Sequence, residues 1–308
     1  MTVTAAVFSP ALRVVRASAR PLALGGSRVA GLLLLLPASG FLLAFFIAPA
    51  LALFGYSVLT QRPDGVVTLP FTLAHFQHFV GTELYTHVLV ATLRMAAVTA
   101  GLAALLGYPV ALVMVRSNAL VMRIMTIVVI APLIVSVVVR TYGWQLLLGN
   151  SRSGVVNWVL LSLGVIHQPM RILYTETAVV IGSLHVFLPM MVLPLASALA
   201  KIDPQLEDAA RTLGAASWRV FWRVTLPLSL PGLAVGLTLV FSLTASSYVT
   251  PAILGGTSAQ MLGNLIEQQI TAVYDWPFGA TVAVVLVVMV LGINLASSWF
   301  LERRRKLA

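Results

Sequence analysis

Six apolar stretches, each of about 20 residues or more, set the strongest limit on how this chain folds. An α-helix needs that length to cross a hydrocarbon core about 30 Å thick. A single strand cannot satisfy its backbone polar groups in lipid, and the sequence lacks the alternating pattern of a membrane β-barrel. We therefore predict an all-α polytopic membrane protein. Its six transmembrane helices are expected over residues 30–59, 84–115, 120–148, 175–200, 231–254 and 278–301.

Composition supports this class, because apolar residues make up 59% and charged residues 9% of the chain, whose mean hydropathy is +0.99. Soluble proteins carry roughly 25% charged residues, which cover a surface that faces water. The first apolar stretch continues past Pro37 and Pro49 to Leu59, which is too long for a cleaved signal peptide. The chain contains no cysteine, so disulfide bonds, thiolate metal sites and cysteine nucleophiles are excluded.

Basic residues are distributed unequally between the segments that join the predicted helices. Fourteen of the nineteen lie before the first helix, between the second and third, between the fourth and fifth, or after the sixth. Lysine and arginine accumulate on the cytoplasmic side of membrane proteins, so we predict that both termini lie in the cytoplasm. The same asymmetry accounts for the net charge of +10, so the lipid bilayer is an expected partner and nucleic acid is not. We divide the chain into a basic cytoplasmic tail over residues 1–28 and a transmembrane domain over residues 29–308.

The connection over residues 201–230 is the largest polar segment expected in the cytoplasm apart from the termini. Asp203 and Pro204 are typical of the start of a helix. Glu207 follows in its first turn, where a negative charge suits the helix dipole. Gly214 is typical of the left-handed residue that ends a helix.

A second short helix is predicted over residues 218–224, with Ser217 as its cap and with Pro227 and Pro231 ending it. Its tryptophan and phenylalanine side chains recur at helical spacing, and two arginines form a basic edge. Exposed aromatic side chains of this size need a cover, which either the membrane interface or another protein would provide.

One motif in this connection reads Asp208-Ala209-Ala210-x3-Gly214-x9-Val224-x-Leu226-Pro227. It resembles the EAA loop of ABC-importer permease subunits, Glu-Ala-Ala-x3-Gly-x9-Ile-x-Leu-Pro, with matching spacing and two conservative replacements. The resemblance extends over most of residues 71–301 and points to the spermidine/putrescine branch of that family. Ser246-Ser247 is a departure, because polyamine permeases often carry Gly-Asp there. The stretches that carry the wider likeness are residues 106–111, 140–144, 199–203 and 248–256.

The resemblance implies the fold of a type I ABC-importer permease, a transport subunit of the bacterial inner membrane that is not an enzyme and carries no cofactor. In that family two permease chains form the pathway, a cytoplasmic ATPase dimer binds the ATP, and a periplasmic binding protein delivers the solute. The EAA loop provides a coupling helix that seats against the ATPase. The coupling residues implied in this way are Asp208, Ala209, Ala210 and Gly214, with Arg211, Trp218 and Arg219 as neighbouring contacts.

The sequence contains no phosphate-binding loop, because neither Lys201 nor Lys306 follows a glycine. The energy for transport would therefore come from a partner chain or from an ion gradient. His75 and His78 are spaced as a ligand pair, but no acid accompanies them, and an exposed or capping role is expected. We predict no metal site and no catalytic chemistry in this chain.

Polar residues within or beside the predicted spans are candidate contacts of the solute. Those of the third and fifth spans are Arg140, Tyr142, Trp144, Thr244, Ser247 and Tyr248. Arg140 either pairs with Glu176 or with carbonyl groups at a helix end, or it lines a cavity. The hydroxyl groups either bond neighbouring helices or line the pathway, and Arg94 is expected to extend toward the outer face.

The solute and the transport class remain open at this level. A polycation site normally combines carboxylates with aromatic faces, yet two arginines and no acid lie deep in the predicted spans. Either the pathway is a conduit whose selectivity is held by the binding protein, or the solute is anionic. The favoured function is an ABC permease for a polyamine such as spermidine or putrescine, or for another small polar solute. The alternatives are an ion-coupled secondary transporter, for which no acid relay or inverted repeat is visible, and a membrane scaffold whose hairpin docks a partner.

Overall fold

The computed structural model describes residues 28–62 and 64–307, so the predicted tail lies outside the described residues except for its last position. The described residues fall into two units, which divide after Ala52. In the first unit, α1 (Arg28–Leu42) passes through a π-helical turn (Leu43–Ile47) into α2 (Ala48–Tyr56), which continues past the boundary between the units. No side chain of this turn or of α2 is buried, as expected of a helix whose apolar surface meets lipid.

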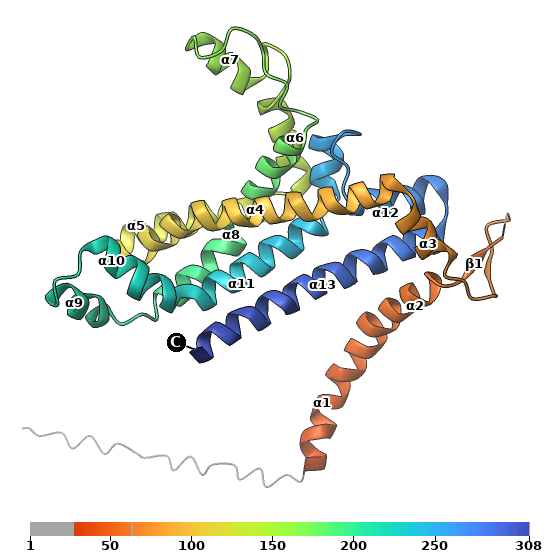
Figure 1. The fold of residues 1–308 in the computed structure, drawn as a ribbon, viewed down its shortest axis with the longest axis horizontal. Coiled ribbons are helices and arrows are strands. Elements are labelled where there is room, and N and C mark those ends of the chain that lie inside the picture. The colour runs from red at the N-terminus through yellow and green to blue at the C-terminus, as the bar shows by residue number, and fades with distance from the viewer. Residues whose placement is uncertain (1–27, 63, 308) are drawn as a thin grey trace, which may run out of the picture. The chain divides into compact units, whose positions relative to one another are not determined.

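Three helices form the core of the second unit (Figure 1). They are α4 (Glu83–Arg116), α8 (Glu176–Leu199) and α11 (Leu226–Ala245), and α8 packs along both of the others. Met191 of α8 is fully buried in a cluster of small and branched side chains that includes Ala100 and Val240. Small residues allow the helices to approach closely, which is how membrane helices gain contact area.

Gly232 and Gly236 bring α11 onto α8. A Cβ atom at Gly232 would overlap the Cβ of Ala198 and lie 2.7 Å from the carbonyl oxygen of Pro194. A Cβ atom at Gly236 would lie 2.6 Å from the sulfur of Met191. Both distances are shorter than van der Waals contact, so the two helices pack at a separation that requires glycine at these positions.

All three core helices contain internal prolines. These are Pro109 in α4, Pro189 and Pro194 in α8, and Pro231 in α11. Proline lacks an N–H group, so the carbonyl group four residues earlier has no helical partner. The helices nevertheless continue through these positions, because the packed neighbours support the backbone there.

Short elements pack beside α4 and α13 at the end of the bundle opposite to α9 and α10 (Figure 1). Thr92 of α4 accepts a hydrogen bond from the Leu262 N–H at 2.9 Å. The side chain of Gln61 donates to the carbonyl of Tyr274 at 2.7 Å and accepts from the Trp276 N–H at 3.1 Å. The short elements are β1 (Thr60–Gln61), β2 (Val67–Thr68) and α3 (Ala74–Gly81) before α4, and α12 (Leu262–Gln268) and the π turn Gln269–Val273 before α13. The helix α13 covers Trp276–Leu307.

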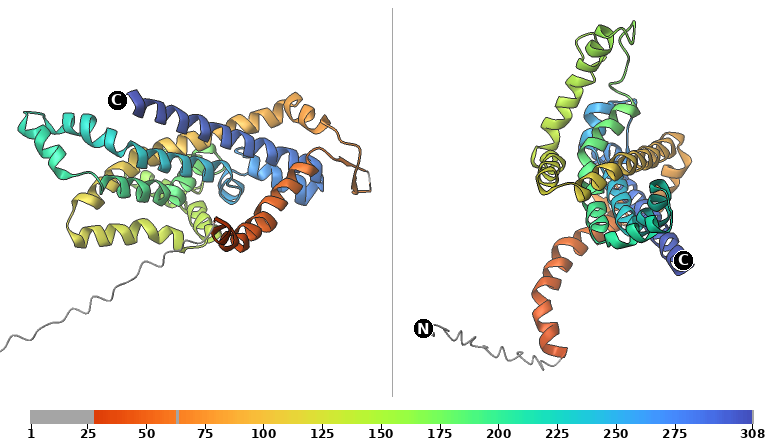
Figure 2. Two further views of the ribbon diagram at one scale, coloured as in Figure 1. Left: turned by 90° about the horizontal axis from the view of Figure 1, so that it is seen from below. Right: turned by 90° about the vertical axis from the view of Figure 1, so that its left-hand side faces the viewer.

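The third predicted span, residues 120–148, is not one straight helix. It is divided into α5 (Ala119–Ile134) and α6 (Val137–Leu147), which are bent by 100°. Val135 and Ser136 between them have extended backbone conformations. Arg140 of α6 donates to the carbonyl of Pro132 near the end of α5, which satisfies a backbone group that the break exposes. Beyond α6 the chain leaves the core and forms α7 (Val155–Ser162) (Figures 1 and 2).

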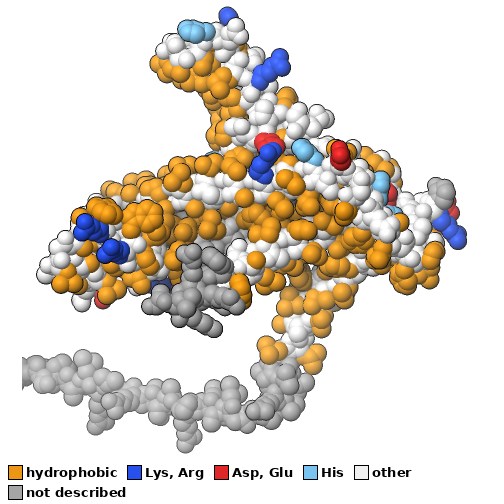
Figure 3. Space-filling model, in the orientation of Figure 1, with side chains coloured by type: hydrophobic (Ala, Val, Ile, Leu, Met, Phe, Trp, Pro, Cys, Tyr) orange, Lys and Arg blue, Asp and Glu red, His pale blue; other side chains and the backbone are white. Residues whose placement is uncertain are grey.

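Five helices in the described part of the chain are long and apolar enough to cross a membrane, and the bent pair α5–α6 makes six if it counts as one span. Apolar side chains accordingly cover much of the flanks of the helices (Figure 3). The fifth of the six helices covers Ser217–Ala245, so it begins before the predicted span over residues 231–254 and ends earlier.

The prediction that Pro227 and Pro231 end the second hairpin helix is wrong. A π turn, Phe221–Thr225, precedes Pro227, and the Leu226 N–H bonds the carbonyl of Phe221. The wider turn shifts the hydrogen-bond pattern before the first proline, so the helix continues into α11 without interruption.

Candidate functional site

A helical hairpin lies at one end of the core bundle, formed by α9 (Pro204–Thr212) and α10 (Ser217–Val220) (Figure 1). The carboxylate of Asp203 accepts a hydrogen bond from the Gln205 N–H at 2.9 Å and caps α9, as predicted. Gly214 has a φ of +86°, a left-handed conformation that glycine adopts without strain, so it forms the predicted turn. Ser217 is the first helical residue of α10 and not its cap, because Ala216 holds that position.

The hairpin presents apolar and basic side chains outward. Leu213 is 89% exposed and Trp218 is 63% exposed, and the guanidinium of Arg219 lies 5.3 Å from the centre of the Trp218 ring. Basic side chains gather at this end of the molecule (Figure 3). Phe221, by contrast, turns inward and its ring packs edge-on against Tyr108 of α4. The predicted aromatic face is therefore divided between the exposed surface and the core.

All seven predicted coupling residues lie on this hairpin. Asp208 and Ala209 are exposed on α9, and the Asp208 carboxylate accepts from Arg211 at 3.1 Å. A groove of about 340 Å³ runs between the two helices, with Ala210, Gly214 and Arg219 among its lining residues. The structure thus brings the motif residues together on one surface, while their role in coupling stays a proposal.

Glu207 of α9 points in the opposite direction, into the molecule. It is the only charged residue among the described positions that is buried, at 9% exposure. Its carboxylate forms an ion pair with Arg116, the last residue of α4. It also accepts a hydrogen bond from the Thr225 hydroxyl at 2.7 Å and lies 3.5 Å from the guanidinium of Arg211.

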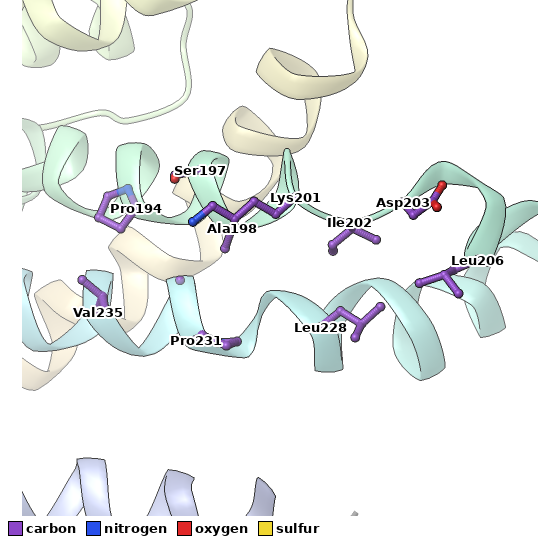
Figure 4. A pocket seen from close by; sticks show the side chains of 11 residues that line it. Pro194, Ser197, Ala198, Lys201, Ile202, Asp203, Leu206, Leu228, Pro231 and Val235 are labelled. Carbon is purple, nitrogen blue, oxygen red and sulfur yellow. The ribbon is translucent and has the colours of Figure 1, made fainter. Parts of the chain in front are cut away.

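A second groove, of about 600 Å³, runs between the end of α8 and the start of α11, beside the hairpin (Figure 4). Its walls are mostly apolar and include Pro194, Leu228 and Val235. The side chain of Lys201 lies back along α8 toward Ala198 (Figure 4). The groove is therefore mostly apolar, with Lys201 and Asp203 as its two charged lining residues.

The arginines of the predicted spans have partners within the protein. Arg140 pairs with the carbonyl of Pro132, so of its two predicted pairings the structure shows the helix-end carbonyl and not Glu176. Glu176 instead forms an ion pair with Arg94, whose side chain is 58% exposed. Arg94 is thus paired with a carboxylate, whereas Arg140 bonds a carbonyl through one terminal nitrogen and its buried Nε has no partner.

The other predicted residues of the third span lie on α6. Tyr142 is 53% exposed, whereas Trp144 is partly buried and donates from its indole to Nδ1 of His185 at 3.0 Å. His185 is therefore engaged in an interhelical hydrogen bond. Because α6 is bent by 100° from α5, Tyr142 and Trp144 lie on a separate helix segment that points in another direction from α5.

Thr244, Ser247 and Tyr248 do not form one stripe on a helix. α11 ends at Ala245, and Thr244 is completely buried while Tyr248 is 52% exposed. Ser247 is half-buried. Thr244 is therefore part of the packed core, and only the two residues beyond the end of the helix can meet a solute without a rearrangement.

Tyr248 lines a groove of about 250 Å³ at this end of α11. Ser246 and Gly263 also line it, together with Ile266 and Glu267 of α12. The carboxylate of Glu267 is exposed and accepts a hydrogen bond from the Thr271 hydroxyl at 3.0 Å. An aromatic ring and a carboxylate thus share one groove, a combination that suits an organic cation.

Comparison with known proteins identifies the family. Residues 83–304 match the family described as the binding-protein-dependent transport system inner membrane component. The chain belongs to this family. It is therefore an inner-membrane permease with several membrane-spanning helices, and its function is transport and not catalysis.

Curated relatives of the permease include spermidine/putrescine transport system permease proteins named PotB. The Escherichia coli protein is 35% identical over 264 residues, which cover 86% of this chain and 94% of the relative. The Haemophilus influenzae protein is 33% identical over 249 residues, covering 81% and 86%. Among solved structures, a bacterial alginate ABC transporter in complex with an alginate-bound periplasmic protein matches with a TM-score of 0.68 at 19% identity, covering 89% of this chain and 94% of that chain. The last likeness shows the fold alone, which is that of a type I permease.

Sequence reasoning missed two acidic residues of the permease. Glu207 is adjacent to the coupling motif, and from the sequence it was assigned only to the helix dipole. Its partner Arg116 ends the second span and pairs with no other acid among the described residues. Glu267 lies between the predicted fifth and sixth spans, and its proximity to Tyr248 depends on how α12 folds back. The described residues contain no group of three or more histidine or acidic side chains that would hold a metal.

Proposed function

We propose that the permease is one of two membrane subunits of an ATP-driven importer, and that its α9–α10 hairpin binds a separate cytoplasmic ATPase, which holds the ATP. The observation that carries this proposal is the division of the hairpin into two faces. Trp218 and Leu213 are exposed at its tip, where they require a cover, while Glu207 and Phe221 anchor its base to the core. The exposed surface of the hairpin is apolar and basic, and its base is fixed to the core, so an ATPase bound to this surface could move the membrane helices through it.

The proposed assembly also contains a periplasmic binding protein, which would deliver the solute at the far end of the bundle. The alginate transporter of similar fold is a complex with such a protein. In this arrangement the hairpin and both termini of the permease lie in the cytoplasm, as the excess of basic residues in these segments predicts. Ser247 and Tyr248 then lie toward the periplasmic side of the proposed pathway.

Replacement of Gly214 by proline tests the hairpin. Proline holds φ near −65° and has no N–H, whereas Gly214 has a φ of +86° and donates to the carbonyl of Arg211 at 2.9 Å. We expect Gly214→Pro to abolish co-purification of the ATPase and solute uptake in membrane vesicles, while the chain still inserts. Retention of both would contradict the coupling role.

A matched control is available at Gly65. It has a φ of +84° and donates to the carbonyl of Arg62 at 2.9 Å, so Gly65→Pro causes the same local distortion in a different turn. We expect this variant to retain the ATPase. If the two variants lose it equally, the effect reports general instability and not the hairpin.

We further propose that the solute is a small organic cation of the polyamine type. The PotB relatives carry spermidine and putrescine in their names, and the groove of Tyr248 and Glu267 offers an aromatic face beside a carboxylate. The two arginines that favoured an anionic solute in the sequence are engaged by Glu176 and by the carbonyl of Pro132. The structure therefore offers more support for a cation.

The charge of Glu267 provides the test of this second proposal. We expect Glu267→Gln to raise the spermidine concentration for half-maximal uptake about 1.4- to fivefold, because an exposed ion pair contributes roughly 0.2–1 kcal/mol. Uptake would be measured in proteoliposomes with the same concentration of the same binding protein for every variant, so that its affinity for spermidine is common to all and the ratio between variants reports the permease. Glu83→Gln, which removes an acid outside the groove, is the control, and an equal change in both variants would contradict the assignment.

A further inference from the structure

The buried carboxylate of Glu207 connects three parts of the permease. It pairs with Arg116 at the end of α4, with the hydroxyl of Thr225 at the start of α11, and with Arg211 on its own helix. Thr225 is 1% exposed and the Glu207 side chain is 12% exposed, so water competes little for the bond between them. The Arg116 side chain is 48% exposed, so its charge meets both Glu207 and water. We call Glu207, Arg116 and Thr225 the hairpin clasp.

A second polar contact lies deeper in the bundle and joins the same two core helices. The hydroxyl groups of Tyr108 and Ser229 are 2.7 Å apart and both residues are buried. The ring of Tyr108 also packs against Phe221, with 5.3 Å between ring centres. Thr225 and Ser229 are four residues apart and face the same side of the helix, so α4 and α11 are held together at two successive levels.

We propose that Glu207 is a positioning residue, whose clasp transmits movement of the hairpin to α4 and α11 together. This inference rests on the proposed coupling function. The exposed side of the hairpin contacts the ATPase, and the clasp on its opposite side determines which membrane helices follow. Without the clasp, the hairpin retains its partner surface and its turn at Gly214, but its link to α4 is lost.

The inference is tested with Glu207→Gln in the complete transporter, with the ATPase, the second permease subunit and the binding protein reconstituted in proteoliposomes. Glutamine keeps the size of the side chain and its hydrogen-bonding oxygen, but it removes the charge that pairs with Arg116. We expect the complex to assemble and to hydrolyse ATP, while the number of spermidine molecules taken up per ATP falls at least about fivefold, the lower end of coupling between distant sites. A general loss of fold would instead lower assembly, hydrolysis and uptake together.

Glu176→Gln is the matched control, because it removes the charge from the only other inter-helix ion pair among the described residues, that with Arg94. We expect this variant to keep the wild-type ratio of uptake to hydrolysis. Thr225→Val provides a second variant of the clasp, which loses only the hydroxyl donor to Glu207. Its ratio is expected to fall in the same direction and by less.

A chemical link made after folding separates positioning from folding. The chain has no cysteine, so Arg116→Cys with Glu207→Cys supplies the only two thiols, and both positions line one groove of about 500 Å³. We expect the reduced double variant to be uncoupled and a short bifunctional maleimide to restore at least half of the wild-type uptake per ATP.

The outcomes distinguish this inference from the proposed function. If the ATPase binds and drives uptake, but neither Glu207→Gln nor Thr225→Val lowers uptake per ATP, the inference is overturned and the function stands. Failure of the linked double variant to recover coupling would also overturn it. If the wild-type chain does not bind an ATPase, the proposed function itself fails.

Discussion

Single atoms determine how closely the core helices pack. At Gly232 a methyl group would meet the backbone carbonyl of Pro194 at 2.7 Å and the Cα of Leu195 at 3.1 Å. Backbone atoms cannot rotate away as side chains do, so α8 and α11 would have to separate. Glu207 shows the same dependence on single groups, because one carboxylate satisfies donors from two core helices.

Gly232→Ala is accordingly expected to lower the free energy of unfolding by about 1–3 kcal/mol, the usual cost of overpacking a filled site. Reversible unfolding by denaturant in detergent micelles measures this change. Gly101→Ala in α4 is the control, because nothing lies within 4 Å of its added Cβ. We expect that variant to be as stable as the wild type or about 0.5–1 kcal/mol more stable, and equal destabilisation of both would contradict the close approach.

Helices and their ends could be predicted from the sequence where the signals are local. Asp203 and Gly214 act on neighbouring backbone groups, so the start and end of α9 followed from residue types alone. The bend between α5 and α6 could not be predicted in this way, since Val135 and Ser136 interrupt the helix without lowering the hydropathy of the stretch.

The same limit explains which parts of the candidate site were missed. The coupling motif is contiguous, so its residues could be named from the sequence. The partners of Glu207 and Glu267 are distant in the chain or depend on how α12 folds back, and only packing places them together. Thr244 and Tyr248 were both predicted to contact the solute from the fifth span, because no proline or glycine marks the end of α11 at Ala245.

At the scale of the whole molecule, the charge distribution sets the expected orientation in the membrane. Basic residues are concentrated on the hairpin and near both ends of the sequence, and acidic residues predominate in the connections at the opposite end of the core. Ser217 and Ser151 are exposed positions on these two sides and provide reporters in a chain without cysteine.

We expect Ser151→Cys to react with a membrane-impermeant maleimide applied to intact spheroplasts, and Ser217→Cys to react only after the membrane is opened. The positive-inside rule gives this direction. Labelling is read as a mass shift of the purified chain. The reverse pattern would place the hairpin outside the cell and remove the basis for an ATPase partner.

The internal prolines of the core have a mechanical consequence. Pro109, Pro194 and Pro231 each lie within about two helical turns of the helix end that adjoins the hairpin. At each of them one backbone hydrogen bond is already missing, so a helix can flex there without breaking another. Each of the three core helices therefore has one flexible point close to the hairpin. The short helix ends between these prolines and the hairpin can tilt, while the longer segments on the other side of the prolines keep their packing.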